Sequence, residues 1–118
     1  MKSIIAFISA AGLLLVGCES SNVKLLKSSQ VKCMNYKNVE EMINGNLNKP
    51  SWEDVIGTDG NQYVNITGIM PKADNAMVTF QYRIYPEQET AQFYTVQSNG
   101  ERVNALFALA YFKAMCEE

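Results

Sequence analysis

The chain has 118 residues, and its 10 lysines and arginines against 12 aspartates and glutamates give a formal net charge of −2. This mildly acidic balance argues against a nucleic-acid partner, because phosphate backbones are bound by clustered Lys and Arg. At 47% hydrophobic residues, the sequence can build a core, and its length suits one small domain. It contains no histidine, which removes the commonest general base and the usual Ser/His and Cys/His nucleophile pairs.

Residues 4–16 form a mostly apolar run that ends in Leu15-Val16-Gly17-Cys18. Such a run is too short for a permanent membrane span, which needs about 20 residues, but it suits the central region of a secretory signal. The four final residues resemble the bacterial lipobox. The resemblance implies cleavage between Gly17 and Cys18, and acylation of the Cys18 thiol and of the new amino terminus by chains such as palmitate. The alternative is a plain signal peptide in which Cys18 is coincidental.

Cleavage would remove residues 1–17 as the signal peptide. Residues 18–22 would then form a lipidated cysteine and a polar tether, and residues 23–118 a single domain. An aspartate after the lipidated cysteine resembles the inner-membrane retention signal of enteric bacteria, whereas this chain has Glu19. We therefore expect a lipid-anchored protein of the bacterial cell envelope, on the periplasmic face, with the outer membrane favoured.

Two cysteines remain once Cys18 is assigned to the lipid. An even pair in an oxidising compartment predicts a disulfide between Cys33 and Cys116. Two buried free thiols are the alternative. A metal site is disfavoured because no histidine is available to complete it, and the sequence predicts no cofactor.

A short helix is predicted to begin after Asn38, whose side chain can accept from the amide of Glu41 while Glu41 reaches back toward the cap. An apolar stripe that starts at Val39 gives this helix one buried face. Gly45 and Pro50 limit it to two or three turns. The preceding residues, 23–34, fit either a short strand or a helical turn followed by an extended segment.

Four antiparallel strands are predicted at residues 52–57, 62–69, 76–85 and 91–97. Asp59-Gly60 is a strong hairpin signal, because both residues can adopt positive φ. Residues 70–75 and 86–89 form the other turns. The third strand alternates most regularly, with Val78 and Phe80 on one face and Thr79 and Gln81 on the other.

Residues 101–116 predict a long closing helix after Asn99-Gly100. Its apolar stripe is expected to cover one face of the sheet. The expected fold class is therefore an α+β two-layer sandwich with a short N-terminal helix, a four-stranded antiparallel meander and a C-terminal helix. The stripe consists of Val103, Leu106, Phe107, Ala110, Tyr111 and Ala114.

The order of these elements is similar to that of small Gram-negative bacterial lipoproteins with a Pro-x-Trp and an Asp-Gly hairpin, most of which have no known function. This resemblance supports the fold and implies no active site. The residues that carry it are Pro50, Trp52, Asp59, Gly60, Val64, Gly68, Asn99 and Gly100.

Two features could carry chemistry, and each has a plain structural interpretation. Trp52 could be a ligand platform, although a core plug under the first hairpin is favoured. The acidic pairs Glu53-Asp54 and Glu87-x-Glu89 could act as paired carboxylates, although solvated acids beside turns are favoured.

The strand face away from the helices is a possible partner-binding face, because Tyr and Arg are enriched at interfaces. An exposed mixed face is also ordinary in a small antiparallel domain. The residues of this predicted partner face are Thr79, Gln81, Arg83, Tyr85, Gln92 and Tyr94.

Together these features predict a non-enzymatic, lipid-anchored periplasmic protein that binds an envelope protein, as an assembly, exclusion or immunity factor. The first alternative is an inhibitor of an envelope-directed hydrolase such as lysozyme, with the turn at 70–75 as its protruding loop. The second is a small enzyme or a ligand carrier, which would need an apolar cavity of a few hundred Å3.

Overall fold

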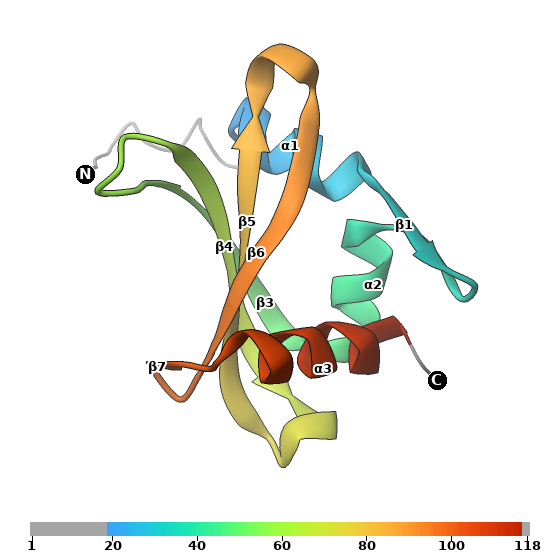
Figure 1. The fold of residues 1–118 in the computed structure, drawn as a ribbon. Coiled ribbons are helices and arrows are strands. Elements are labelled where there is room, and N and C mark those ends of the chain that lie inside the picture. Colours follow the sequence, from blue (N-terminus) through green and yellow to red (C-terminus); the bar gives the residue numbers. More distant parts are fainter. Residues whose placement is uncertain (1–18, 117–118) are drawn as a thin grey trace, which may run out of the picture.

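The computed structural model describes residues 19–116 and has an α+β fold, as the sequence predicts (Figure 1). The predicted cleavage site at Gly17 and Cys18 lies outside the described residues. The elements follow in the order α1 (Ser21–Ser28), β1 (Gln30–Cys33), β2 (Tyr36–Asn38), α2 (Val39–Asn46), β3 (Asn48–Ile56), β4 (Gln62–Met70), η2 (Pro71–Ala73), β5 (Ala76–Tyr85), η3 (Pro86–Gln88), β6 (Thr90–Ser98), β7 (Glu101–Arg102) and α3 (Ala105–Cys116).

The larger sheet is an antiparallel meander in the order β3-β4-β5-β6-β7. Three of its long strands, β4, β5 and β6, lie within one residue of their predicted bounds, whereas β3 begins at Asn48, four residues before its predicted start. The sequence did not predict the two-residue strand β7, nor the separate β1–β2 hairpin. A register shift between Gln81 and Tyr82 leaves Tyr94 without a partner on β5, and this bulge bends β6.

The Asp-Gly turn between β3 and β4 differs in detail from the prediction. Only Gly60 adopts a positive φ, at 83°. Asp59 remains at negative φ because its carboxylate accepts a hydrogen bond of 2.9 Å from the amide of Asn61, which closes the turn through the side chain.

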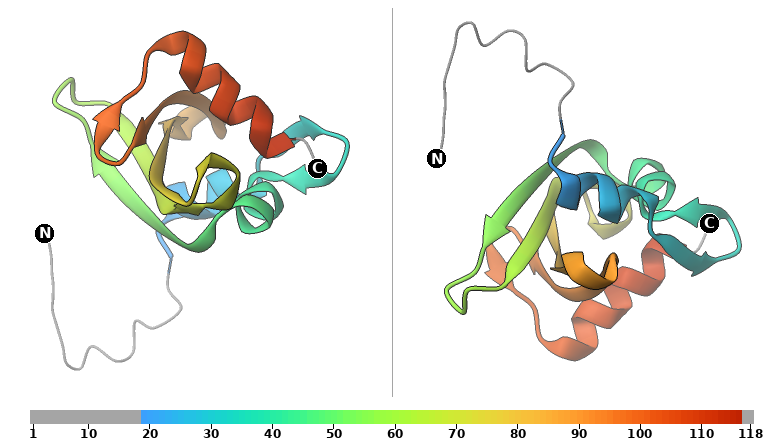
Figure 2. Two further views of the ribbon diagram at one scale, coloured as in Figure 1. Left: turned by 90° about the horizontal axis from the view of Figure 1, so that it is seen from below. Right: turned by 90° about the horizontal axis from the view of Figure 1, so that it is seen from above.

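The core lies between the inner face of the sheet and the helices. The sheet curls, and in both views of Figure 2 the helices lie on its inner side. Val64, Phe80 and Val96 are fully buried there, together with Leu26 of α1. Trp52 is half-buried against this core, with the Lys27 ammonium 5.0 Å from the centre of its ring, which favours the interpretation of Trp52 as a core residue.

Helix α1 begins earlier than the expected domain boundary. Ser21 and Asn22, which the sequence assigned to the tether, already belong to the helix. The Ser20 hydroxyl accepts from the amide of Val23 at 3.1 Å and so caps the first turn. Glu19 forms an ion pair with Lys27 in the last turn, so that residue 19 also contacts the folded domain.

Helix α2 has the predicted N-terminal cap. The Asn38 side chain accepts from the amide of Glu41 at 2.9 Å. The Glu41 carboxylate reaches back one residue further than in a standard capping box and accepts from the amide of Lys37 at 2.9 Å. Met42 and Ile43 on its inner face are fully buried.

Helix α3 forms but begins at Ala105 rather than Glu101, and the predicted apolar stripe is correct only in part, because Val103, Tyr111 and Ala114 pack against the core. Leu106 and Phe107 are 74% and 58% exposed, while Ala108 and Met115 are buried. Eleven of its twelve residues are apolar, so hydrophobic periodicity could not identify the inner face. No helix within residues 19–116 has the length and apolarity to cross a bilayer.

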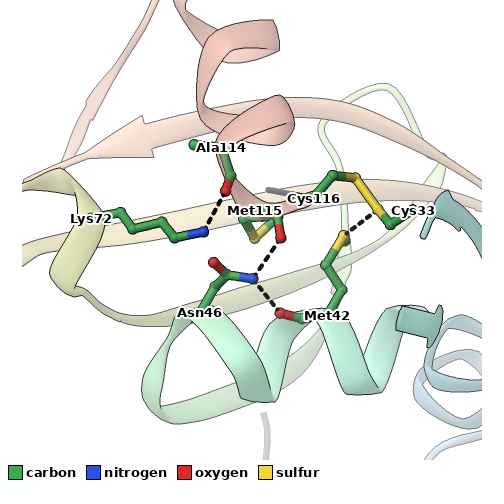
Figure 3. The surroundings of a disulfide bond; sticks show 7 residues. All are labelled: Cys33, Met42, Asn46, Lys72, Ala114, Met115 and Cys116. Atoms are coloured by element: carbon green, nitrogen blue, oxygen red, sulfur yellow. Dashed lines mark hydrogen bonds between the residues drawn. A yellow bond between two sulfur atoms is a disulfide. The ribbon is translucent and has the colours of Figure 1, made fainter. Parts of the chain in front are cut away.

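Contacts at the C-terminal end of α3 select the buried face (Figure 3). Cys116 is joined to Cys33 at the end of β1 by a disulfide, as predicted, with a Cα–Cα distance of 5.2 Å. The buried Asn46 side chain donates to the carbonyl of Met115 at 2.7 Å, and the Lys72 ammonium donates to that of Ala114 at 2.8 Å. The last carbonyls of a helix have no hydrogen-bond donor within the helix. Asn46 and Lys72 supply donors to two of them, and these two bonds fix both the position and the rotation of α3.

Candidate functional site: the outer face of the sheet

The six residues of the predicted partner face lie on β5 and β6, and no helix within residues 19–116 covers the outer side of this sheet (Figure 2). Arg83 is paired in register with Gln92, and Gln81 with Thr95, so that the two strands contribute side by side. Tyr94 is 50% exposed and Gln92 is exposed. The remaining members, Thr79, Gln81, Arg83 and Tyr85, are half-buried.

Strand β4 extends this face with residues that the sequence reasoning missed. The hydroxyls of Thr67 and Thr79 are 2.9 Å apart, and Gln81 donates to the Asn65 side chain at 2.9 Å. The register across the turn at residues 70–75 was the signal that could have placed β4 beside this face, because it pairs Tyr63 with Arg83. The polar side chains in the middle of the outer face therefore bond to one another. The side chains that remain available to a partner lie toward the ends of the strands.

One end of this face is aromatic. The rings of Tyr63 and Tyr94 lie 5.3 Å apart in a tilted arrangement, a favourable geometry for two aromatic side chains. The Tyr63 hydroxyl donates to the Asp59 carboxylate at 2.7 Å, which fixes the ring. Beside the two rings is a shallow hollow of about 200 Å3, lined also by Gln81 and Arg102.

Hydrogen bonding lowers the pKa of Asp59, chiefly through the backbone amide of Asn61 and then through the Tyr63 hydroxyl. The same bond to Asp59 raises the pKa of Tyr63. A carboxyl group whose pKa is lowered in the folded state stabilises the fold at pH values above its ordinary pKa. This stabilisation is lost as the pH falls through the pKa of the folded state. Asp59 therefore stays charged at neutral pH, and the two side chains hold one arrangement.

Arg83 is the main positive group of the face. Its guanidinium lies 4.8 Å from the centre of the Tyr85 ring, and the Tyr85 hydroxyl donates to Gln92 at 3.3 Å. Arg83 Nε is shielded from solvent and has no hydrogen-bond acceptor within residues 19–116. Arg83 and Tyr85 also line an open hollow of about 460 Å3 beside the β5–β6 turn. The guanidinium is thus positioned by stacking on Tyr85.

The other candidates from the sequence are placed less favourably for chemistry. Glu53 and Asp54 are exposed neighbours on β3 and therefore point to opposite faces of the sheet. Glu87 and Glu89 are exposed beside the β5–β6 turn. Within the described part of the chain, no group of three His, Cys, Asp or Glu side chains could hold a metal ion.

The turn at residues 70–75, the expected loop of an inhibitor, contacts the rest of the domain. Lys72 donates to the last turn of α3, and Ala73 packs against the core. Two other turns, at residues 57–61 and 86–89, border the hollows of the outer face instead.

Comparison of this chain with protein-family models, with curated proteins and with solved structures finds no match in any of the three.

Proposed function

We propose that this chain is a lipid-anchored, non-enzymatic protein of the bacterial cell envelope that binds a protein partner through the outer face of its sheet. The contact is centred on an outer patch made of Arg83, Tyr85 and Tyr94, with the buried ring of Tyr63 packed against Tyr94. The observation that carries this proposal is the Arg83 guanidinium, which is stacked on Tyr85 and lies on the same uncovered face as the half-exposed Tyr94.

The composition and rigidity of the outer patch favour a protein partner. Tyrosine and arginine are the residues most enriched at the centres of interfaces. Tyr63 is held by Asp59, and Arg83 by stacking on Tyr85, so that little side-chain entropy remains to be lost on binding. A partner carboxylate or carbonyl could accept hydrogen bonds from the Arg83 guanidinium. We therefore expect a partner segment that presents an acidic or carbonyl group.

Removing the patch should weaken capture of the partner from crosslinked envelopes. We expect the double variant Arg83→Ala with Tyr94→Ala to recover at least tenfold less partner, since single residues at the centre of an interface commonly contribute about 2 kcal/mol or more. The measurement is quantitative mass spectrometry of proteins that co-purify with the full chain.

Met34→Ala with Lys37→Ala is the matched control, because both residues are exposed on the β1–β2 hairpin away from the outer face. Unchanged capture by the patch variant would refute the assignment of the face. Capture of a cell-wall hydrolase that loses activity on binding would identify the inhibitor class of function.

The anchor is tested separately at Cys18. Cys18→Ser should abolish incorporation of labelled palmitate and release the chain from the membrane fraction, because a hydroxyl cannot form the thioether. Met34→Ser, at a fully exposed position of the β1–β2 turn, is the control and should retain the label. Palmitate on the Cys18→Ser variant would contradict the lipobox, while leaving the outer patch open to its own test.

A further inference from the structure

The chain enters the folded domain directly after the proposed anchor. Glu19, the residue that follows Cys18, forms an ion pair with a lysine in the last turn of α1. The Ser20 hydroxyl caps this helix, which begins at Ser21. Residues 19–22 therefore belong to the fold and provide no flexible spacer. A lipid on Cys18 would be attached one peptide bond away from the folded domain.

The start of α1 lies at the same end of the molecule as two turns of the larger sheet. The Asn22 side chain donates to the side chain of Gln62, the first residue of β4, at 2.7 Å. Ser21 and Lys24 line a shallow hollow together with Glu89 of the β5–β6 turn. Figure 1 shows α1 and both turns in the upper half of the molecule and α3 below them, and the view from above in Figure 2 brings the same three segments to the front. We call this region the anchor end, and it comprises residues 19–24, 57–61 and 86–89.

The outer patch extends to the anchor end. Tyr85 is the last residue of β5, and Arg83 precedes it by about 7 Å along the strand. Both side chains line the open hollow that also has Gly60 and Pro86, from the two turns, in its walls. The other end of β5, at Ala76, is about 30 Å away. The positive group of the patch is therefore close to the point where the lipid would be attached.

The side chains of the anchor end suit contact with the surface of a bilayer. Ile56, which pairs with Gln62 beside the β3–β4 turn, is 69% exposed, and Lys24 is exposed on α1. An aliphatic side chain can enter the boundary between headgroups and acyl chains, and an ammonium group can contact lipid phosphates. Glu87 and Glu89 are also exposed here, which keeps the contact at the level of the headgroups.

We propose that the lipid holds the anchor end against the bilayer, so that Arg83 and Tyr85 face a membrane-embedded partner just above the headgroups. This inference rests on the anchor and the binding face proposed above. An attachment without a spacer keeps the patch at one height. The effective concentration of the patch is then high only for a partner whose contact site lies at that height. The acidic or carbonyl group expected of the partner therefore belongs to a segment at the membrane surface.

The orientation is tested with the exported, acylated chain in phospholipid vesicles. A coumarin amino acid replaces Gln88 in the β5–β6 turn and, in a control chain, the exposed Met77 near the far end of β5. Nitroxide-labelled headgroups quench only at short range, so they should quench position 88 several-fold more than position 77. Equal quenching at the two positions would overturn the orientation. Absence of labelled palmitate from these chains would overturn the anchor itself, and the inference with it.

A rigid spacer tests the class of partner. A helical insert of about 20 residues between Cys18 and Glu19 would lift the patch by about 30 Å, whereas a Gly/Ser insert of equal length lets the domain return to the bilayer. Both inserts begin with glutamate, so that the residue after Cys18 is unchanged. We expect the helical insert to recover about fivefold less partner from crosslinked envelopes than the flexible insert.

Equal recovery of the partner with the two inserts would overturn the membrane-embedded partner. The double variant Arg83→Ala with Tyr94→Ala separates this outcome from failure of the binding face, because it measures whether the outer patch binds at all. Loss of partner in that variant, together with equal recovery from the two inserts, would leave a binding face whose partner is not fixed at the membrane surface.

Discussion

Replacing both Cys33 and Cys116 with serine is expected to lower the free energy of unfolding by about 4–5 kcal/mol. The disulfide joins residues 83 positions apart, and a crosslink across so long a loop removes much of the conformational entropy of the unfolded chain. Domains of this size are commonly stable by only about 5–15 kcal/mol. Urea unfolding followed by the fluorescence of Trp52, the single tryptophan, measures the loss.

Reduction of the unaltered chain is the control for the serine substitutions, because it breaks the bond and keeps both sulfur atoms. Reduced chain and double variant should unfold at similar urea concentrations. Labelling of Cys33 and Cys116 by a thiol reagent in the exported, unreduced protein would contradict the prediction. A free energy of unfolding for the double variant within about 1 kcal/mol of that of the unaltered chain would also contradict it.

The same disulfide explains which parts of the fold could be predicted from the sequence. The long strands and helix α2 depend on local signals, namely alternation, turn residues and the Asn38 cap, and these elements form as predicted. The buried face of α3 depends on long-range contacts. A helix that is apolar on all sides has no preferred face until Cys116 and Met115 are fixed to distant parts of the chain.

The candidate site likewise contains residues that local sequence signals predict and residues that depend on contacts between strands. Alternation along β5 was sufficient to place Thr79, Gln81, Arg83 and Tyr85 on one face. Tyr63 lies beside this face because the strand register pairs it with Arg83. Asp59 reaches Tyr63 from the turn, where its carboxylate also accepts from the amide of Asn61. Even so, alternation alone could not distinguish hydrogen-bonded residues such as Gln81 from Arg83, whose Nε lacks an acceptor.

The end of α3 also depends on a buried polar residue that the sequence did not single out. Asn46 is 5% exposed, and its amide nitrogen donates to the carbonyls of Met42 at 2.8 Å and Met115 at 2.7 Å. It therefore joins the last turns of α2 and α3 (Figure 3). A buried carbonyl left without a donor costs about 1–3 kcal/mol, so that this one side chain should have a large effect on stability.

Asn46→Asp preserves the shape of this side chain and replaces its donor by a carboxyl group. We expect a loss of about 3–5 kcal/mol at pH 7, the usual cost of an uncompensated buried charge. Burial and the two facing carbonyls favour the protonated form, so the pKa of the new carboxyl group should rise above its ordinary value of about 3.9. The folded variant then holds a proton that the unfolded chain releases.

The pH dependence follows from that difference in bound protons. Below the ordinary carboxyl pKa both states are protonated, and the variant should come closest to the unaltered chain. As the pH rises toward the raised folded-state pKa, its stability should fall by up to about 1.4 kcal/mol per pH unit relative to that chain. Urea unfolding at pH 4 and pH 7 measures this. Asn44→Asp, exposed on the same helix, should show little of the effect. If the two variants had the same pH dependence, Asn46 would not hold the ends of α2 and α3 together.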